Sequence, residues 1–227
     1  MILNVVDQIN NALIVDNRYK YILTGVSNTL IMAFFAVIIG LILGLAIALI
    51  RNNYDNNKRW RIFNILCKSY VAIIRGTPVL LQLMIIYYVI FASVNVNVVL
   101  VGIIAFGLNS AAYVSEIIRA GLDSIDKGQM DGGRALGLNY NETMRYIILP
   151  QAFKNIMPAL GNEFITLLKE TSVAGYIGII ELTKAGDIIA SRTYNYFFPL
   201  ILTALIYLVL TLGLSKIIKK FEKRGGT

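Results

Sequence analysis

The sequence predicts an all-α membrane protein with five transmembrane helices, and two observations lead to this fold class. Hydrophobic residues make up 57% of the chain and charged residues 15%, whereas soluble domains average roughly 45–50% and 25%. Five apolar runs are long enough to cross a hydrocarbon core, which takes about 20 residues of helix. The formal net charge of +8 does not point to nucleic acid, because the basic residues cluster beside the apolar runs.

The predicted spans form one transmembrane domain over residues 1–227, with a long loop over 117–155. The apolar run from Tyr21 to Ile50 is too long for a cleaved secretory signal, and the amino terminus lacks the basic flank of one. We therefore expect this run to be retained as the first span. The five spans lie near residues 23–50, 70–92, 96–116, 156–178 and 196–216.

Small residues repeat every four positions along the first predicted span and so share one helix face. They are Ala36, Gly40, Gly44 and Ala48. Membrane helices approach closely where such residues lie. We expect this face to contact another helix, within the subunit or in a second one, unless it only reflects the abundance of glycine and alanine in spans.

Lys and Arg residues are distributed unequally between the loops, and this bias sets the orientation of a membrane protein. Fifteen lie in the loop after the first span, the 117–155 loop and the carboxyl tail, against four in the other loops. We therefore expect the amino terminus outside and the carboxyl terminus in the cytoplasm, a parity that five spans satisfy. The fifteen are Arg51, Lys58, Arg59, Arg61, Lys68, Arg119, Lys127, Arg134, Arg145, Lys154, Lys216, Lys219, Lys220, Lys223 and Arg224, and the four are Arg18, Lys20, Lys184 and Arg192.

The residues of catalysis and metal binding are scarce. The chain has no histidine and a single cysteine, Cys67, so an internal disulfide is excluded and no Cys/His metal site is expected. The commonest general base is missing, and no G-x-x-x-x-G-K-[ST] phosphate loop occurs. We expect no enzyme activity in this chain alone, no cofactor and no metal, and ATP hydrolysis would need a partner.

The 117–155 loop carries balanced charge and several glycines. Asn139 and Glu142 have the spacing of a capping box, which starts a new helix. Pro150 disfavours a helical conformation at Leu149, so we expect the new helix to end there. Gly137 then lies between two short helices. Such a helix-turn-helix is suited to docking in a groove of another protein; the alternative is an amphipathic hairpin on the lipid surface.

Polar and ionisable side chains at bilayer depth are costly, which makes them functional candidates. Helical spacing in the fourth predicted span places five of them on one face: Asn162, Glu163, Thr166, Lys169 and Glu170. We interpret Asn162 and Glu163 as substrate contacts, with Glu163 pairing with a cationic group. The alternative is a structural network in which Lys169 neutralises Glu170.

The second and third spans supply the remaining candidate contacts. Asn109 can hydrogen-bond a carboxylate or amide of a ligand, or it can join two helices instead. Arg75, at the inner end of the second span, can reach the headgroups and is also placed for gating. The other candidates are Thr77, Gln82, Ser110 and Tyr113.

Four motifs follow one another along the chain. They are RGTP at residues 75–78, AYVSEIIRAGLDSIDKGQ at 112–129, DGG-x3-G-x9-I-x-L-P at 131–150 and LLKETS at 167–172. Together they resemble the permeases of polar amino acid ABC importers, whose EAA motif is E-A-A-x3-G-x9-I-x-L-P and whose fourth stretch is LLKDTS. The departures are Asp131 for Glu, Gly132 and Gly133 for alanines, and Glu170 for Asp. Each extra glycine should loosen the first short helix by about 1 kcal/mol.

The resemblance covers about residues 20–215 and implies a type I importer permease that works as a dimer of membrane subunits, homodimeric or heterodimeric. It also implies a multi-pass protein of a prokaryotic cell membrane. A cytoplasmic subunit would bind ATP and Mg²⁺, and an extracellular or periplasmic binding protein would deliver an amino acid. The residues implied in coupling to the ATP-binding subunit are Asp131, Gly132, Gly133, Arg134, Gly137, Leu138, Asn139, Leu149 and Pro150.

The substrate class rests on Glu163. A carboxylate facing a cavity favours a basic amino acid such as arginine, lysine or histidine, and glutamine is the nearest rival. A channel or ion-driven transporter, or a scaffold that binds soluble proteins, would explain the apolar spans. Neither would explain the RGTP stretch or the motif around Gly137.

Overall fold

The computed structural model describes residues 9–58 and 60–225, and all regular structure within them is helical. Arg59 and the side chains of Lys223 and Arg224, counted above among the inner cations, lie outside this description. The elements are η1 (Asn10–Ile14), η2 (Val15–Asn17), α2 (Tyr19–Asn57), α3 (Arg61–Arg75), α4 (Val79–Ile85), η3 (Ile86–Ile90), α5 (Val98–Asp123), α6 (Lys127–Ala135), α7 (Tyr140–Thr143), η4 (Met144–Ile148), α8 (Leu149–Glu170), η5 (Thr171–Ile177), α9 (Leu182–Thr193) and α10 (Phe197–Gly225).

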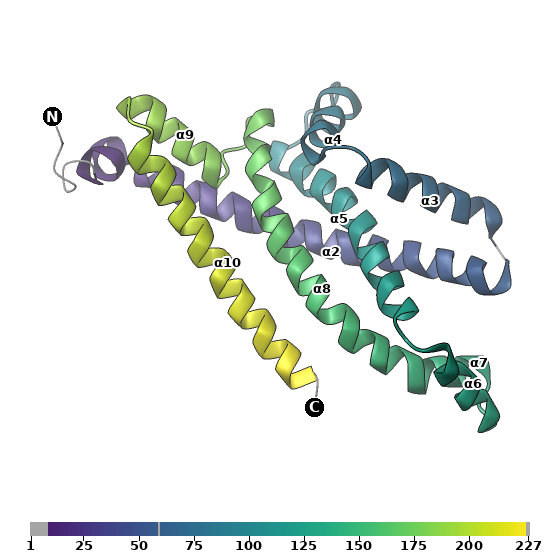
Figure 1. Ribbon diagram of the computed structural model, residues 1–227. Helices are drawn as coiled ribbons and strands as arrows, with labels where there is room; N and C mark the ends of the chain where they lie inside the picture. The colour runs from purple at the N-terminus through teal and green to yellow at the C-terminus, as the bar shows by residue number, and fades with distance from the viewer. Residues whose placement is uncertain (1–8, 59, 226–227) are drawn as a thin grey trace.

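The small-residue face of α2 packs against α5 of the same chain (Figure 1). A methyl group at Gly40 would lie 2.7 Å from Ser110 Oγ, and one at Gly44 would lie 2.7 Å from Val114 Cγ1. Neither position has room for a side chain, so the two helices approach more closely than larger residues would permit. The predicted packing face is confirmed, and it joins helices within one subunit.

The second span is broken, which corrects the expectation of one helix near 70–92. The helix begins at Arg61 and ends at Arg75, and α4 leaves Gly76–Pro78 at an angle of 111° to α3. Pro78 has no backbone N–H and restricts the conformation of Thr77 before it. The RGTP sequence therefore separates the two helices instead of lying within one.

The helix of the fourth predicted span, α8, begins and ends earlier in the sequence than expected. It runs over Leu149–Glu170 where a span near 156–178 was expected, and η5 follows it. The expected helix end at Leu149 is wrong: Leu149 is itself helical, and Pro150 lies in the first turn of α8. Proline fits there because the first turn of a helix leaves its N–H groups unpaired anyway, and the π-helical turn η4 leads into it.

Three described helices are long and apolar enough to cross a membrane, or four if the bent pair α3 and α4–η3 counts as one span. They are α2, α5 and α10. The polar residues on α8 keep it outside this group, so its role as the remaining span stays a prediction. The bundle as described agrees with the predicted all-α membrane fold.

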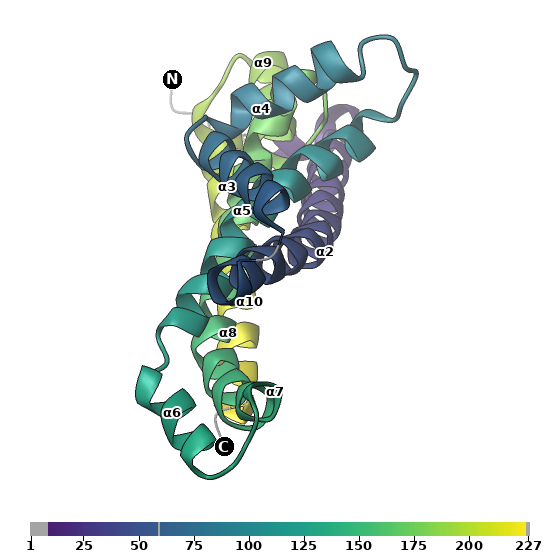
Figure 2. The same cartoon turned by 90° about the vertical axis from the view of Figure 1, so that its right-hand side faces the viewer.

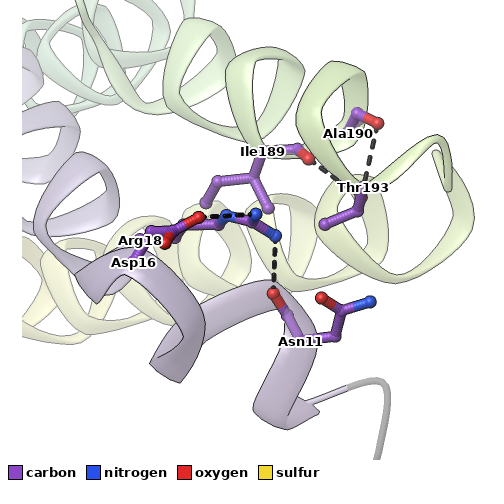
Figure 3. Close-up of polar contacts among 6 residues, drawn as sticks. All are labelled: Asn11, Asp16, Arg18, Ile189, Ala190 and Thr193. Atoms are coloured by element: carbon purple, nitrogen blue, oxygen red, sulfur yellow. Dashed lines mark hydrogen bonds and ion pairs between the residues drawn. The ribbon is translucent and has the colours of Figure 1, made fainter.

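Opposite ends of the bundle carry different elements (Figures 1 and 2). At one end η1 packs beside α9, a helix where sequence alone predicted a loop over 181–195. Arg18 is buried at this end, where its guanidinium donates to Asn11 O at 2.8 Å and to Asp16 at 2.9 Å beside the last turn of α9 (Figure 3). At the other end lie α6, α7 and the carboxyl end of α10.

Candidate functional site

The break in the second span is held by one buried side chain, Gln82. Its amide Nε2 donates to Ile74 O at 2.8 Å, Thr77 O at 3.0 Å and Thr77 Oγ1 at 2.9 Å. The Thr77 hydroxyl in turn donates to Ile73 O at 2.8 Å. Gln82 and Thr77 thus supply partners for backbone carbonyls that the helix break leaves without their usual donors.

Asn109 of α5 extends this network to the neighbouring helix. Its amide Nδ2 donates to Gln82 Oε1 at 2.9 Å, and the residue is 2% exposed. The other amide atom, Asn109 Oδ1, is buried and has no hydrogen-bond partner among the described residues. Buried polar atoms are rarely left unpaired, so this oxygen has unused capacity to accept a hydrogen bond.

The next residue, Ser110, faces a different helix. Its hydroxyl donates to Glu163 Oε1 of α8 at 3.0 Å. Ser110 is fully buried, Glu163 is partly buried and Asn162 beside it is exposed in the single chain. Adjacent residues of α5 therefore join the broken span on one side to the carboxylate of α8 on the other.

Charged groups gather further along α5 at Glu116. Arg51, the residue after the apolar part of α2, forms an ion pair with Glu116, and Arg75 Nη1 lies 3.4 Å from Glu116 Oε2. The Arg75 guanidinium also lies 5.6 Å from the centre of the Tyr113 ring, within the range of a cation–π contact. Tyr113 thus contacts Arg75.

The sequence missed the part that Arg51 plays. Its charge was counted only for orientation. Because Arg51 lies at the end of one predicted span and Glu116 at the end of another, an ion pair between them could have been predicted. The placement of Arg75 beside Glu116 ties the RGTP break to both α2 and α5.

The 117–155 loop forms the predicted helix-turn-helix. Asn139 N donates to Glu142 Oε2 at 2.8 Å and Glu142 N to Asn139 Oδ1 at 3.0 Å, so the capping box is confirmed. Gly137 has φ +88°, a conformation that favours glycine. Leu138 N donates to Gly133 O at 3.2 Å, which closes α6 with the bond pattern common at helix ends.

The outer part of this loop is exposed and partly apolar. Leu136 is 82% exposed, and Asp131, Arg134 and Leu149 are also exposed. Gly133 is buried instead. A methyl group placed there would lie 2.5 Å from Thr143 Cγ2, so the position has no room for a side chain. The loop therefore has a packed inner side against α7 and an exposed side that presents both charged and apolar groups.

A second buried carboxylate lies at the end of the bundle that carries α9. Glu181 is 0% exposed and caps α9 by accepting hydrogen bonds from the N–H groups of Thr183 and Lys184, each at 2.7 Å. Burial raises the pKa of this carboxyl, while these bonds and one from the Tyr207 hydroxyl oppose the rise. Glu181 borders a pocket of about 430 Å³ with Lys184 and Asp187. Sequence reasoning did not identify it, because Glu is not among the residues preferred at a helix N-cap.

Residues 36–225 match the family described as "Binding-protein-dependent transport system inner membrane component". The chain belongs to this family of permeases.

The permease has relatives with closely similar sequences over nearly their whole length. It is 42% identical over 209 residues to a putative glutamine transport system permease protein of Rickettsia bellii, covering 91% of this chain and 94% of the relative. It is 42% identical over 209 residues to the arginine transport system permease protein ArtQ of Bacillus subtilis, covering 91% and 93%.

Solved structures agree with the fold of the permease. A crystal structure of an amino acid ABC transporter with histidines matches with a TM-score of 0.85 and 41% identity, over 99% of this chain and 100% of that one. The inward-facing MetNI methionine ABC transporter matches with a TM-score of 0.74 at 19% identity, over 91% and 97%, which bears on the fold alone. The type I importer fold expected from the motifs is confirmed.

Proposed function

We propose that this permease imports a polar amino acid, with a preference for basic ones, and that ATP hydrolysis on a separate cytoplasmic subunit drives the import. The named relatives include arginine and glutamine permeases, and the similar solved transporter was crystallised with histidines. The family name itself calls for a binding protein that delivers the substrate. The whole chain, residues 1–227, then acts as one transmembrane domain.

The hydrogen bond between Ser110 and Glu163 is the observation that carries the substrate assignment. It places a carboxylate against the small-residue contact of α2 and α5, with exposed Asn162 beside it. A carboxylate in an apolar bundle is costly unless a cation or hydrogen-bond donors accompany it. An ammonium or guanidinium group of a substrate supplies that cation, and Ser110 holds the carboxylate in position.

The remaining candidates contribute in two ways. Asn109 offers its unpaired Oδ1 to a donor of the substrate, while Thr77 and Gln82 hold the broken span that Asn109 contacts. Tyr113 positions Arg75 at the inner end, where we propose a gate. These roles are consistent with contacts that join the second, third and fourth spans around Asn109 and Ser110.

Replacing Glu163 tests the substrate preference. The permease is reconstituted in proteoliposomes with its ATP-hydrolysing subunit and binding protein, and ATPase stimulation is measured with arginine, lysine, histidine and glutamine. We expect the basic amino acids to stimulate the wild type. We expect Glu163→Gln to lose at least about tenfold of that stimulation, the effect of about 1.4 kcal/mol in binding one charge. Binding of each amino acid to the isolated binding protein identifies the ligand directly.

Matched variants and outcomes make the result decisive. Thr166→Val, on the same face of α8 but without a described contact to Ser110, should keep the wild-type preference. Stimulation of the wild type by glutamine alone would overturn the basic preference and leave import of a polar amino acid intact. Stimulation of Glu163→Gln by the basic amino acids at the wild-type level would remove Glu163 from the substrate site.

Import of glutamine is the second candidate, favoured by the glutamine transport names of several relatives. Glutamine shares the ammonium and carboxylate of arginine but lacks the extra charge. In that case Glu163 would pair with the α-ammonium group, and the preference for basic side chains would be absent.

We also propose how the partners meet the permease. The exposed side of the 117–155 loop, including Leu136, Asp131 and Arg134, docks on the ATP-binding subunit, which holds ATP and Mg²⁺. A second permease subunit, identical or related, completes the pore in the prokaryotic cell membrane. The amino terminus lies outside and the carboxyl terminus in the cytoplasm, as the loop charges predict.

A further inference from the structure

A groove of about 320 Å³ lies between α2 and α3, near the carboxyl-terminal part of α2. Its walls are apolar, since most of the lining side chains are aliphatic. The hydroxyl of Tyr70, the one polar group on the lining side chains apart from the Cys67 thiol, donates to Leu108 O. Leu43 and Leu66 on its two sides remain exposed, 38% and 61%. The lining residues are Leu43, Ala46, Ile47, Ile50, Leu66, Cys67, Tyr70 and Leu108.

The groove ends at a cluster with surplus positive charge. Arg51 follows the lining residue Ile50 directly, is 8% exposed and has a buried Nε without a hydrogen-bond partner among the described residues. Two guanidinium groups, those of Arg51 and Arg75, share the single carboxylate of Glu116. These three described side chains together carry one net positive charge.

A further cation lies toward the same end. Arg61, in the first turn of α3 at the end where α2 stops, is exposed. The apolar groove is suited to the acyl chain of a phospholipid. The basic end of the groove is suited to an anionic headgroup.

We propose that this groove binds one anionic phospholipid, with an acyl chain between α2 and α3 and the phosphate at the Arg51 end. The acyl chain fills apolar space that water would occupy at a cost, and a basic pocket between membrane helices selects an anionic headgroup over a neutral one. This site is separate from Ser110 and Glu163, so it does not depend on the substrate proposed above.

Native mass spectrometry of the full chain released from nanodiscs tests the proposal. The nanodiscs contain equal amounts of phosphatidylglycerol and phosphatidylcholine with identical acyl chains. We expect one retained phosphatidylglycerol per chain, enriched about fivefold over phosphatidylcholine, the preference that one basic side chain confers. Equal retention of the two lipids, or no retained lipid, overturns the proposal.

Two variants locate the lipid. Ala46→Phe fills the groove and should abolish the enrichment, while Leu45→Phe adds a similar ring at the neighbouring position, which does not line the groove, and should keep it. Enrichment that survives in Ala46→Phe, judged on protein that elutes as the wild type does, overturns the site. The wild-type comparison stands even if that variant fails to fold.

The single cysteine gives an independent measurement. Cys67 lines the groove, so alkylation by N-ethylmaleimide should be several-fold slower in nanodiscs with phosphatidylglycerol than in pure phosphatidylcholine. Equal protection in both lipids, together with joining of two chains through Cys67 by a bismaleimide, would assign the groove to a second copy of the permease and overturn the lipid site. Rapid alkylation in both lipids would leave the groove empty and also overturn it.

Discussion

Two adjacent glycines in α6 differ in their surroundings, although they replace the same kind of residue in the motif. Nothing lies within 4 Å of a methyl group placed at Gly132. At Gly133 such a group would lie 2.5 Å from Thr143 Cγ2 and 3.1 Å from Ile147 Cδ1. Helix propensity alone would favour alanine at both positions, so packing decides between them.

We therefore expect Gly132→Ala to stabilise α6 by about 1 kcal/mol, because alanine is the better helix former and space is available. Gly133→Ala should have the opposite effect, since α6 would have to move away from α7. Amide hydrogen exchange of residues 127–135 in the purified permease measures both. Equal protection gains in the two variants would contradict the packing of α6 on α7.

At the scale of elements, the turn between α6 and α7 requires a left-handed backbone at Gly137, φ +88°. A methyl group there would meet no atom within 4 Å, so the side chain itself has room. A bulky residue is still unfavourable, because a non-glycine residue in this conformation costs about 1–2 kcal/mol. The turn sets the direction in which the exposed side of α6 points.

We expect Gly137→Leu to uncouple ATP hydrolysis from amino acid import while leaving membrane insertion intact. Gly137→Asn is the matched control, because asparagine adopts the left-handed conformation more readily than leucine, and it should keep more of the coupling. The ratio of amino acid imported to ATP hydrolysed in proteoliposomes is the measurement. Unchanged import in Gly137→Leu would remove this loop from the mechanism.

The broken second span is the other element whose shape matters. The chain turns by 111° at Gly76–Pro78, and Gln82 pairs with the carbonyls exposed there. Through Asn109 and Arg75 the break contacts α5 at two levels, one beside Ser110 and one beside Glu116. A shift of the RGTP turn would therefore reach both the proposed substrate site and the inner charge cluster.

At the scale of the whole molecule, the two ends of the bundle carry different elements, with α9 at one and the α6–α7 loop at the other (Figure 2). We predict that the α6–α7 end faces the cytoplasm. In a Cys67→Ser background, Asn141→Cys should react with a membrane-impermeant maleimide only after the cells are opened. Ser93→Cys, in the turn between η3 and α5, should react in intact cells. The reverse pattern would invert the orientation.

Much of the fold followed from local patterns. The close contact of α2 and α5 was predicted from the four-residue spacing of Gly40 and Gly44, and the capping box from Asn139 and Glu142. Both depend on residues near one another in the chain, where helix geometry fixes which side chains share a face. The end predicted at Leu149 failed because a local preference before proline was overridden by the helical path from η4 into α8.

The candidate site was predicted as a set of residues, and its pairings were not. The sequence placed Asn109 and Ser110 on α5 and Glu163 on α8 without indicating which would meet. Ser110 bonds Glu163 across 53 residues and Asn109 bonds Gln82 across 27. Which partner each side chain has depends on the rotation and crossing of whole helices, and no local pattern specifies these.

The sequence by itself determined that this chain is a helical membrane protein with a helix-turn-helix loop and the motifs of an importer permease, because those properties rest on composition, period and spacing. The tertiary structure alone decided that the second span breaks by 111°, that Arg51 and Arg75 converge on Glu116, and that Glu181 is buried at the start of α9. Such features arise when distant segments pack together. Their energies depend on burial and on partners that are brought together only in the folded bundle.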